Sequence, residues 1–398
     1  NFSVLISLKK PKRMNENILI IERRLFSAIG HERTQVNAIN ELIGNEKSIV
    51  ISCKGINLNN MPFKNKVISK LPKFNLKEEG KEPLKYIQES GDSLIKIIEE
   101  NKFKKNTKII IPSARKLEIA LIIYLYKQNK IPLTLNIVIR ILDLVFIKDL
   151  TKSQLNIFIE LINKGLIKLF TETEELIKKI ENNFKIKCSG VLILPVSVPY
   201  NLKINNRKIR KKDHLYIGCL GGPRRSKGTF IIPKIIKNLR KYFKKNKINF
   251  KVTFIIQMSK DKNKRRILFK IAEFLSRHIS SSVKVKYVYG VEDNKKFILL
   301  LKSINIFLLP YSNIHYKYSG SGFITDAIFL EKPIINSEGM AMNDLRRFEN
   351  SISVSNINDY SSAIIKISKN YEYYVSNSKF AKKYLKNKIR KSFDAILR

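Results

Sequence analysis

Short apolar runs alternate with amphipathic stretches along most of the chain, and many of the runs have the length of a β-strand. In the first half, the strand-like runs and the helix-like stretches cover residues 17–22, 31–42, 48–52, 107–111, 116–127, 166–170 and 172–182. Thr171 and Glu174 have the spacing of a capping box for the last of these helices. Strands that alternate with helices are typical of βαβ units, so this pattern predicts a parallel sheet.

The same alternation begins again in the second half of the chain. Its segments cover residues 215–220, 229–243, 251–257, 262–278, 283–287, 293–301, 304–309, 323–330 and 333–336. Between the halves, residues 190–213 combine prolines with the basic run 203–212, as expected for a connection between domains. We therefore predict an α/β protein with an N-terminal domain at 14–190 and a second, doubly wound domain at 191–370.

The last segment, residues 371–398, has the pattern of a basic amphipathic helix. Its apolar residues recur at helical spacing and are Phe380, Tyr384, Leu385, Ile389, Phe393, Ile396 and Leu397. Lysines and arginines fill the opposite face. Two interpretations stay open, a helix packed on the protein body with a solvated outer face and a helix that lies on a membrane surface.

The composition fits a globular protein of two domains. A chain of 398 residues exceeds one ordinary core, and a hydrophobic fraction of 44% is enough to bury two. The sequence begins with Asn, and we expect residues 1–13 to lie upstream of a natural start at Met14.

The cysteines and the lengths of the apolar runs indicate the compartment. Cys53, Cys188 and Cys219 are far apart and lack metal-ligand spacing, so they predict neither a disulfide framework nor a zinc site. The apolar runs are shorter than the roughly 18 residues that span a bilayer. We expect a cytoplasmic protein that is not integral to a membrane.

The net charge of +44 has two interpretations. The chain is rich in Lys, Ile and Asn, which AT-rich codons encode, so the excess can be a solvated surface without a ligand. A basic surface can also attract an anionic partner, such as the cytoplasmic face of a membrane where lipid-linked glycans reside. The second interpretation predicts a protein that is peripheral on the inner face of the cytoplasmic membrane.

Doubly wound sheets bind ligands outside the carboxyl ends of their strands, and the loop after Leu220 is the first candidate there. Residues 218–228 (GCLGGPRRSKG) connect a predicted strand to a predicted helix. Glycines let a backbone approach a ligand closely, and arginine and lysine bind phosphate, so the loop suits a diphosphate. It lacks the GxGxxG and GxxxxGK[ST] patterns, and a plain basic turn is the alternative. The expected contacts are Gly221, Gly222, Arg224, Arg225 and Lys227.

The loop after Leu309 is the second candidate. It ends in Ser319, Gly320, Ser321 and Gly322, at the start of the predicted helix 323–330. Unpaired N–H groups at a helix start bind phosphate oxygens. We expect Asp326, one turn into that helix, to face the loop and to accept hydrogen bonds from ribose hydroxyls. The alternative is that this carboxylate only stabilises the helix dipole.

Together, the two loops resemble the donor domain of GT-B glycosyltransferases, in the large retaining group called family 4. The family holds its donor diphosphate with an Arg and a Lys that precedes a Gly, and Arg224 or Arg225 with Lys227 match that pair. The family's acidic motif has two acids separated by seven residues. Here the second acid is Asp326, and Tyr318 stands in place of the first. Some members have a Ser-Gly element at that place, as this chain does.

The resemblance covers residues 215–340 and extends weakly to the N-terminal half. There, Gly30 and His31 look like the Gly-His loop that faces the acceptor and the donor phosphate, and residues 112–115 end a second strand at the cleft. The resemblance implies His31, Arg224 and Lys227 as catalytic residues. It implies Gly30, Ser113 and Arg115 on the acceptor side.

The resemblance also implies a GT-B fold, in which two Rossmann-like domains face a central cleft, here with a C-terminal helix. The implied activity is transfer of a sugar from a nucleotide-sugar donor to a glycan or lipid-linked acceptor, with retention. No Asp-x-Asp motif is present, which favours a route without a metal ion, and no other cofactor is expected.

Two alternative functions remain. A nucleic-acid-binding protein would use the basic runs 203–212, 240–247 and 260–266, but these belong to separate predicted elements, so we do not expect nucleic acid as a partner. A sugar-nucleotide epimerase of the same fold would need paired acids and a histidine in the cleft, and no motif predicts them.

Overall fold

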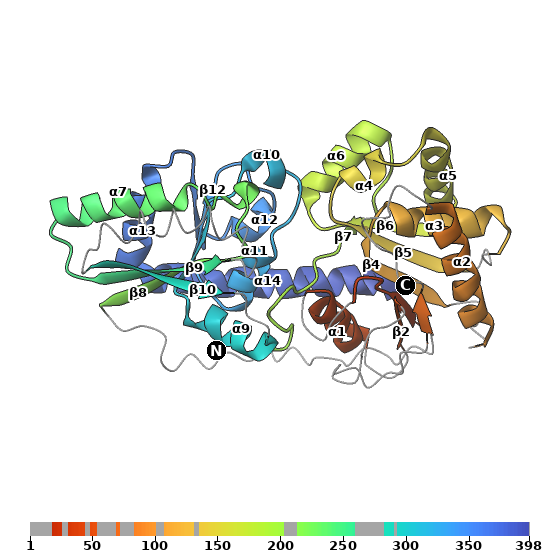
Figure 1. Cartoon of the computed structure of the whole chain (residues 1–398), viewed down its shortest axis with the longest axis horizontal. Helices are drawn as coiled ribbons and strands as arrows, with labels where there is room; N and C mark the ends of the chain where they lie inside the picture. The colour runs from red at the N-terminus through yellow and green to blue at the C-terminus, as the bar shows by residue number, and fades with distance from the viewer. Residues whose placement is uncertain are drawn as a thin grey trace, which may run out of the picture.

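A computed structural model of the chain shows two parallel sheets side by side, each covered by helices, with one long helix that passes behind both (Figure 1). The residues that the structure describes are 18–25, 31–43, 48–53, 69–71, 83–100, 107–130, 135–202, 213–258, 282–289 and 293–397.

The first sheet has seven described strands, all parallel, in the order β3-β2-β1-β4-β5-β6-β7. The strands are β1 Ile18–Ile21, β2 Ser48–Cys53, β3 Ser69–Leu71, β4 Lys108–Ala114, β5 Asn136–Ile141, β6 Ile167–Thr171 and β7 Gly190–Val191. The helices around it are α1 His31–Ile43, α2 Pro83–Glu100, α3 Lys116–Lys127, α4 Val145–Lys148, α5 Lys152–Asn163 and α6 Glu174–Phe184. The strand order reverses between β1 and β4, which is where such sheets bind ligands.

The second sheet has six described strands, all parallel, in the order β10-β9-β8-β11-β12-β13. The strands are β8 His214–Cys219, β9 Lys251–Met258, β10 Val283–Tyr289, β11 Ile306–Leu309, β12 Ile334–Ser337 and β13 Ser351–Val354. Its helices are the 3-10 turn η2 Arg225–Lys227, α7 Ile232–Lys245, α9 Asn294–Ser303, α10 Asn313–Tyr316, α11 Gly322–Phe329, α12 Asn343–Arg346 and α13 Asp359–Lys369. The helix predicted at 262–278 lies outside the described residues.

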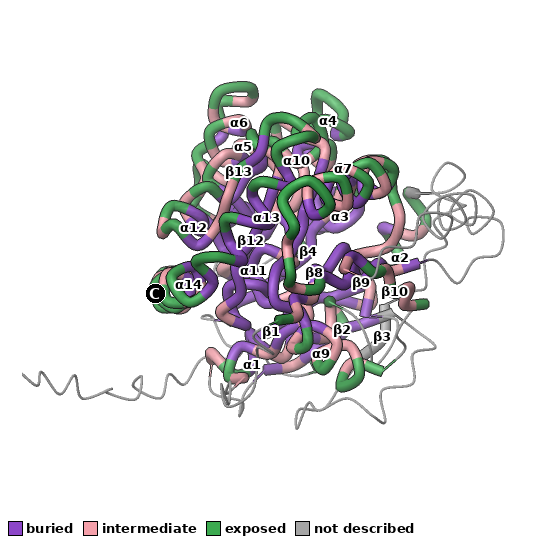
Figure 2. Tube along the Cα trace, turned by 90° about the vertical axis from the view of Figure 1, so that its left-hand side faces the viewer, coloured by how far each residue is buried: buried purple, intermediate pink, exposed green. Residues whose placement is uncertain are grey.

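The apolar runs form strands because both faces of each sheet are covered. All four residues of β1 and of β11 are buried, as expected for strands between two layers of helices. In Figure 2 the buried trace lies inside and the exposed trace runs along the outer helices. One continuous apolar cluster includes Ile20 of the first sheet and Leu309 of the second, so the two halves share a core.

Helix α14, Tyr371–Leu397, joins the two halves from behind (Figure 1). Its stripe of Leu385, Ile389, Phe393 and Ile396 is buried in the shared cluster. The last turn lies against the first sheet, where Lys168 Nζ donates a hydrogen bond to the Ala395 carbonyl at 3.2 Å. The body of the protein therefore covers most of the apolar face of the helix, as in the packed interpretation, whereas Phe380, predicted on the same face, is exposed.

The predicted start of α6 is two residues early. Thr173, not Thr171, is the N-cap, and its Oγ1 accepts a hydrogen bond from the Leu176 N–H at 3.1 Å. Thr171 still belongs to β6, and its hydroxyl donates to the Thr173 carbonyl at 2.7 Å. The spacing of apolar residues does not show where β6 ends and α6 begins, because only two residues lie between them.

Cys188 and Cys219 are free thiols. Within the described parts of the chain, we find no helix with the length and apolar character needed to span a bilayer.

Candidate active site

The two sheets face each other with the loops at the carboxyl ends of their strands. Ser319, after β11 and α10, donates a hydrogen bond to Asp143 Oδ2, after β5, at 3.3 Å. Thr173, after β6, donates from its hydroxyl to the Tyr318 carbonyl. The crevice where doubly wound sheets bind ligands is thus shared by both halves.

The Gly-rich loop after β8 is held open by specific contacts. Gly221 has a φ of +102° and donates its N–H to Gln257 Oε1 at 2.8 Å. A Cβ atom on Gly221 would collide with Lys227 Nζ and would lie 2.5 Å from the Phe323 ring, so only glycine fits here. Gly222 follows with a φ of +63° and has open space beside it. The loop backbone is therefore both close to the Lys227 side chain and open to a ligand.

Lys227 is the central cation of this loop. Its Nζ donates to the Gly221 carbonyl at 2.6 Å and lies 5.3 Å from the centroid of the Phe323 ring, at the start of α11. Burial, and to a smaller extent the positive charge of Arg224, lower the pKa of Lys227 to about 8. An anion at this point would restore the full charge of Lys227, because opposite charges favour the protonated amine.

Arg224 and Arg225 are exposed at the mouth of the same loop. The Arg224 N–H donates to Thr229 Oγ1 at 3.0 Å, and Arg225 lies over the Phe230 ring at 6.0 Å. Both arginines are within three residues of Lys227 in the chain.

The Ser-Gly loop begins α11, which packs against the linker between the sheets. Ser321 is the N-cap and Gly322 is the first helical residue. A Cβ atom on Gly322 would lie 2.7 Å from the Val196 side chain, and one on Gly320 would lie 2.5 Å from the Glu172 carboxyl carbon. The glycines of this loop are thus needed for close approach to the first domain.

Asp326 does not face the loop as expected. Its carboxylate is fully buried, and Oδ1 accepts hydrogen bonds from the N–H groups of Ser197 and Val198, both at 3.0 Å. Burial raises the pKa of Asp326 to about 6, although these hydrogen bonds act in the opposite direction. Asp326 contacts the linker because the helix turns this side chain toward the chain that enters the second domain.

On the first sheet, His31 is the first residue of α1 and its side chain is 46% exposed. Its Nε2 lies 2.8 Å from Glu32 Oε1. Gly30 lies outside the described residues. His31 is therefore available to a ligand at the start of a helix.

Ser113 and Arg115 end β4 and begin α3. Ser113 is buried, and its hydroxyl donates to Gln35 Oε1 at 3.2 Å. Arg115 packs its guanidinium over the Phe146 ring at 5.4 Å. Of these two, Arg115 is the more exposed, and Ser113 joins β4 to α1.

The structure brings together three charged residues that the sequence did not single out. Arg140, fully buried in β5, donates from Nη2 to Glu172 Oε1 at 2.9 Å. Glu22, directly after β1, is buried nearby, and burial raises its pKa to about 7. Glu22 and Glu172 each follow an apolar run at a strand end, and that position was the signal available in the sequence. Among the described residues, no group of three His, Cys, Asp or Glu side chains is arranged to hold a metal ion.

The turn between β6 and α6 fastens the two halves together. Besides Thr173, it supplies Glu175, which accepts hydrogen bonds from the N–H groups of Met342 and Asn343, both at 3.2 Å. Glu174 pairs with Lys388 of α14 at 2.5 Å. Residues 172–175, which we call the interdomain turn, thus contact three separate elements of the second half.

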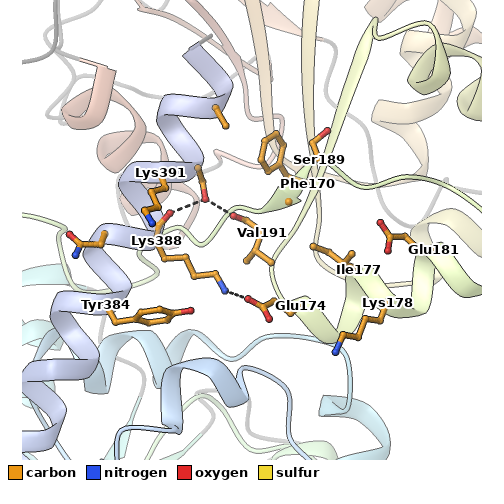
Figure 3. Close-up of a pocket in the computed structure, with 14 residues that line it drawn as sticks. Phe170, Glu174, Ile177, Lys178, Glu181, Ser189, Val191, Tyr384, Lys388 and Lys391 are labelled. Atoms are coloured by element: carbon orange, nitrogen blue, oxygen red, sulfur yellow. Dashed lines mark hydrogen bonds and ion pairs between the residues drawn. The ribbon is translucent and has the colours of Figure 1, made fainter.

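A groove of about 720 Å³ lies between α6 and α14 (Figure 3). Lys388 reaches from α14 across it to Glu174, and the Ser392 hydroxyl donates to the Val191 carbonyl at 2.6 Å. None of the predicted donor-site or acceptor-side residues lines this groove. We therefore regard the groove as part of the joint between the halves and not as the active site.

Solved structures match this architecture over nearly the whole chain, whereas no protein-family model and no curated protein matches the sequence. HepE of Anabaena, solved with UDP and glucose, has a TM-score of 0.60 at 9% identity over 95% of this chain and 98% of its own. The N-terminal domain of Candida albicans trehalose-6-phosphate phosphatase has a TM-score of 0.63 at 12% identity over 98% and 97%. A UDP-forming trehalose-phosphate synthase of Burkholderia xenovorans has a TM-score of 0.60 at 9% identity over 97% and 99%.

The chain has the GT-B fold. This confirms the predicted fold class of two Rossmann-like domains that face a crevice. At 9 to 12% identity the likeness establishes the GT-B fold alone, so the activity has to be argued from the residues of the crevice.

Proposed function

We propose that this GT-B protein is a glycosyltransferase of the retaining, family 4 type, which transfers a sugar from a nucleotide-sugar donor to a glycan or lipid-linked acceptor. The observation that carries the proposal is the partly buried Lys227 ammonium. It lies between a glycine-rich strand end and the first turn of α11, within the crevice shared by both halves. A helix start, an open glycine backbone and a desolvated cation together suit a diphosphate.

UDP is the first donor nucleotide to test. HepE was solved with UDP-glucose, and the Burkholderia xenovorans protein is UDP-forming, which supports uridine as the base in proteins of this shape. The choice of sugar depends on crevice contacts that differ among proteins of one fold.

In the proposed reaction, the acceptor oxygen attacks the anomeric carbon on the face from which the nucleoside diphosphate leaves. The bond from that carbon to the phosphate oxygen breaks, and its electron pair stays with the diphosphate. A diphosphate oxygen takes the acceptor proton, so no nucleophile from the protein is required. Lys227, Arg224 and Arg225 stabilise the negative charge that develops on the leaving group, through preorganised electrostatics and without a metal ion.

The acceptor lies, in this proposal, along the carboxyl ends of the first sheet. In the same proposal, His31 and Arg115, which are both partly exposed, face the acceptor, and His31 orients the donor phosphate or the acceptor.

We also propose that the protein works in the cytoplasm at an anionic membrane surface, to which its net charge of +44 attracts it. The apolar face of α14 is buried, so this attraction is electrostatic and weakens with salt. Sedimentation with vesicles of anionic and of neutral lipid tests it. We expect the protein to pellet with anionic vesicles at low salt. If it stays in the supernatant, the proposed membrane association is wrong.

Thermal stability of the purified protein against UDP, GDP, ADP and their common sugar conjugates tests the main proposal. A ligand that binds the native state raises the melting temperature by mass action. The increase should be lost in Lys227→Ala and reduced in Arg224→Ala. Lys234→Ala, which removes an exposed lysine of the neighbouring helix α7, is the matched control and should keep it.

If no nucleotide or nucleotide sugar raised the melting temperature, the transferase proposal would be contradicted. If RNA or DNA then raised the melting temperature strongly, the basic surface would belong to a nucleic-acid-binding protein instead.

A further inference from the structure

Glu172 is a carboxylate that the first domain presents directly to the Ser-Gly loop of the second. It follows the last residue of β6, at the carboxyl end of that strand. A Cβ atom on Gly320 would lie 2.5 Å from both Cδ and Oε2 of Glu172. The glycine therefore makes room for this carboxylate, and Oε2 is the oxygen that faces the loop.

Arg140 fixes the position of Glu172. Its guanidinium is fully buried and donates to the Leu192 carbonyl at 2.6 Å, to the Pro112 carbonyl at 3.0 Å and to Glu172 Oε1 at 2.9 Å. Three acceptors in fixed positions hold the planar guanidinium in one orientation, and the guanidinium in turn orients the carboxylate. Glu172 is thus preorganised, with one oxygen bound to Arg140 and the other directed toward the loop.

The Ser-Gly loop has no acid of its own. Residues 318–322 read Tyr-Ser-Gly-Ser-Gly. Asp326, further along α11, already accepts hydrogen bonds from two N–H groups of the linker. Two carboxylates reach the loop from the first domain, Glu172 at Gly320 and Asp143 at Ser319. The hydroxyl groups of a sugar ring donate hydrogen bonds, and charged acceptors form the stronger ones.

We infer that Glu172 binds a hydroxyl group of the donor's sugar ring, so that the first domain supplies a sugar-selecting residue to a donor that the second domain holds. This inference rests on the proposed function and adds a residue outside the two donor loops. The two parts of the donor would then be bound by different domains. The diphosphate contacts only the second domain, whereas the sugar also contacts the first.

Calorimetric titration of the full chain with UDP and with UDP-glucose tests the inference. In Glu172→Gln, the affinity for UDP should stay within about twofold, while the affinity for UDP-glucose should fall by about 10- to 100-fold, as for a lost hydrogen bond to a charged group. Glu160→Gln is the matched control. It makes the same change on α5, where the side chain is 44% exposed and pairs with Lys164 of the same domain, and both affinities should be unchanged.

Two further measurements separate recognition from support of the fold. Glu172→Asp keeps the carboxylate but withdraws it from the loop, and it should lower UDP-glucose affinity without lowering UDP affinity. Deoxyglucose conjugates of UDP should identify one hydroxyl whose removal weakens binding to the natural protein but has no further effect on Glu172→Gln.

Equal loss of UDP and UDP-glucose affinity in both variants, or no loss in either, would overturn the inference. A natural protein that binds neither UDP nor UDP-glucose would contradict the proposed donor instead, so the two failures can be distinguished.

Discussion

Lys227 illustrates how a single side chain is tuned by its surroundings. Its ammonium is mostly surrounded by Gly221, Phe323 and Tyr311, and both burial and the neighbouring Arg224 disfavour the charge. The resulting pKa of about 8 lies within the range in which proteins work. The charge of the proposed donor site therefore depends on pH and on the ligand.

We expect UDP to raise the pKa of Lys227, since a diphosphate favours the protonated amine. Binding should take up a proton above about pH 8, and UDP affinity should fall as the pH rises through that value. Titration calorimetry at about pH 9, in buffers with different ionisation enthalpies, measures the uptake. Lys227→Arg keeps its charge and should show none, and a constant affinity across this range in the natural protein would contradict the prediction.

Asp326 is expected to stabilise the linker and not to bind the nucleotide. Asp326→Ala leaves two buried N–H groups without their acceptor and should lower the free energy of unfolding by about 1–3 kcal/mol. Asp326→Asn keeps an acceptor, and it should gain stability relative to the natural protein above pH 6. The raised pKa of Asp326 means that its contribution is present below the unfolded value of 3.8 and is lost as the pH rises through about 6.

Urea unfolding at pH 5 and at pH 7.5, together with UDP titration, tests this assignment. A variant with unchanged free energy of unfolding that no longer binds UDP would instead support the ribose contact predicted from the sequence.

At the scale of elements, α14 combines an apolar stripe with ends that are fixed by polar contacts. Leu385, Ile389 and Phe393 lie one turn apart and are buried in the cluster shared by both sheets. At the C-terminal end, Lys108 and Lys168 of the first sheet donate to backbone carbonyls of the last turn. Positive groups at this end also stabilise the helix dipole, so the sheet and the helix support each other.

Two phenylalanines on this helix give a matched pair. Phe393 is buried, and Phe393→Ala should lower the free energy of unfolding by about 3–5 kcal/mol because it leaves a cavity. Phe380 is 60% exposed, and Phe380→Ala should change the free energy of unfolding by about 0.5 kcal/mol or less. Urea unfolding compares them, and equal effects would show that α14 does not pack as described.

At the scale of the molecule, the interdomain turn, the linker and α14 hold the crevice in its present shape. The interdomain turn contacts Tyr318, Met342, Asn343 and Lys388, which lie on the Ser-Gly loop, at the start of α12 and on α14. Most of these contacts are single polar bonds in partly solvated surroundings, each worth about 1 kcal/mol. A donor that contacts both halves should therefore strengthen a closed arrangement.

Weakening the interdomain turn should open the molecule. The double variant Thr173→Val with Glu175→Met removes the donor and the acceptors that join the two halves here, and small-angle scattering should show a larger radius of gyration. UDP-glucose should reverse the increase by binding to both halves. Thr151→Val removes a comparable helix cap on α5, away from the crevice, and should leave the radius unchanged. An unchanged radius in the double variant would contradict this role.

The sequence by itself predicted a parallel sheet covered by helices in each half, although the strands β3, β5, β7 and β13 were not among the predicted segments. Apolar runs such as 17–22 and 304–309 became buried strands because a parallel sheet between two helical layers requires apolar residues on both faces. Loops such as 218–228 were located correctly at strand ends, because the alternation of strands and helices fixes which end of each strand carries a loop. The glycines and cations of the proposed donor site followed from these local patterns.

Only the tertiary structure decided which distant residues meet. Asp326 contacts Ser197 of the linker, and Glu172 lies against Gly320, although 148 positions of the chain separate Glu172 from Gly320. A periodic pattern shows which face of an element is apolar, but it carries no information about which polar residue stands opposite across a crevice. That choice depends on how the two sheets are joined by the linker, the interdomain turn and α14, and these contacts form only when the whole chain has folded.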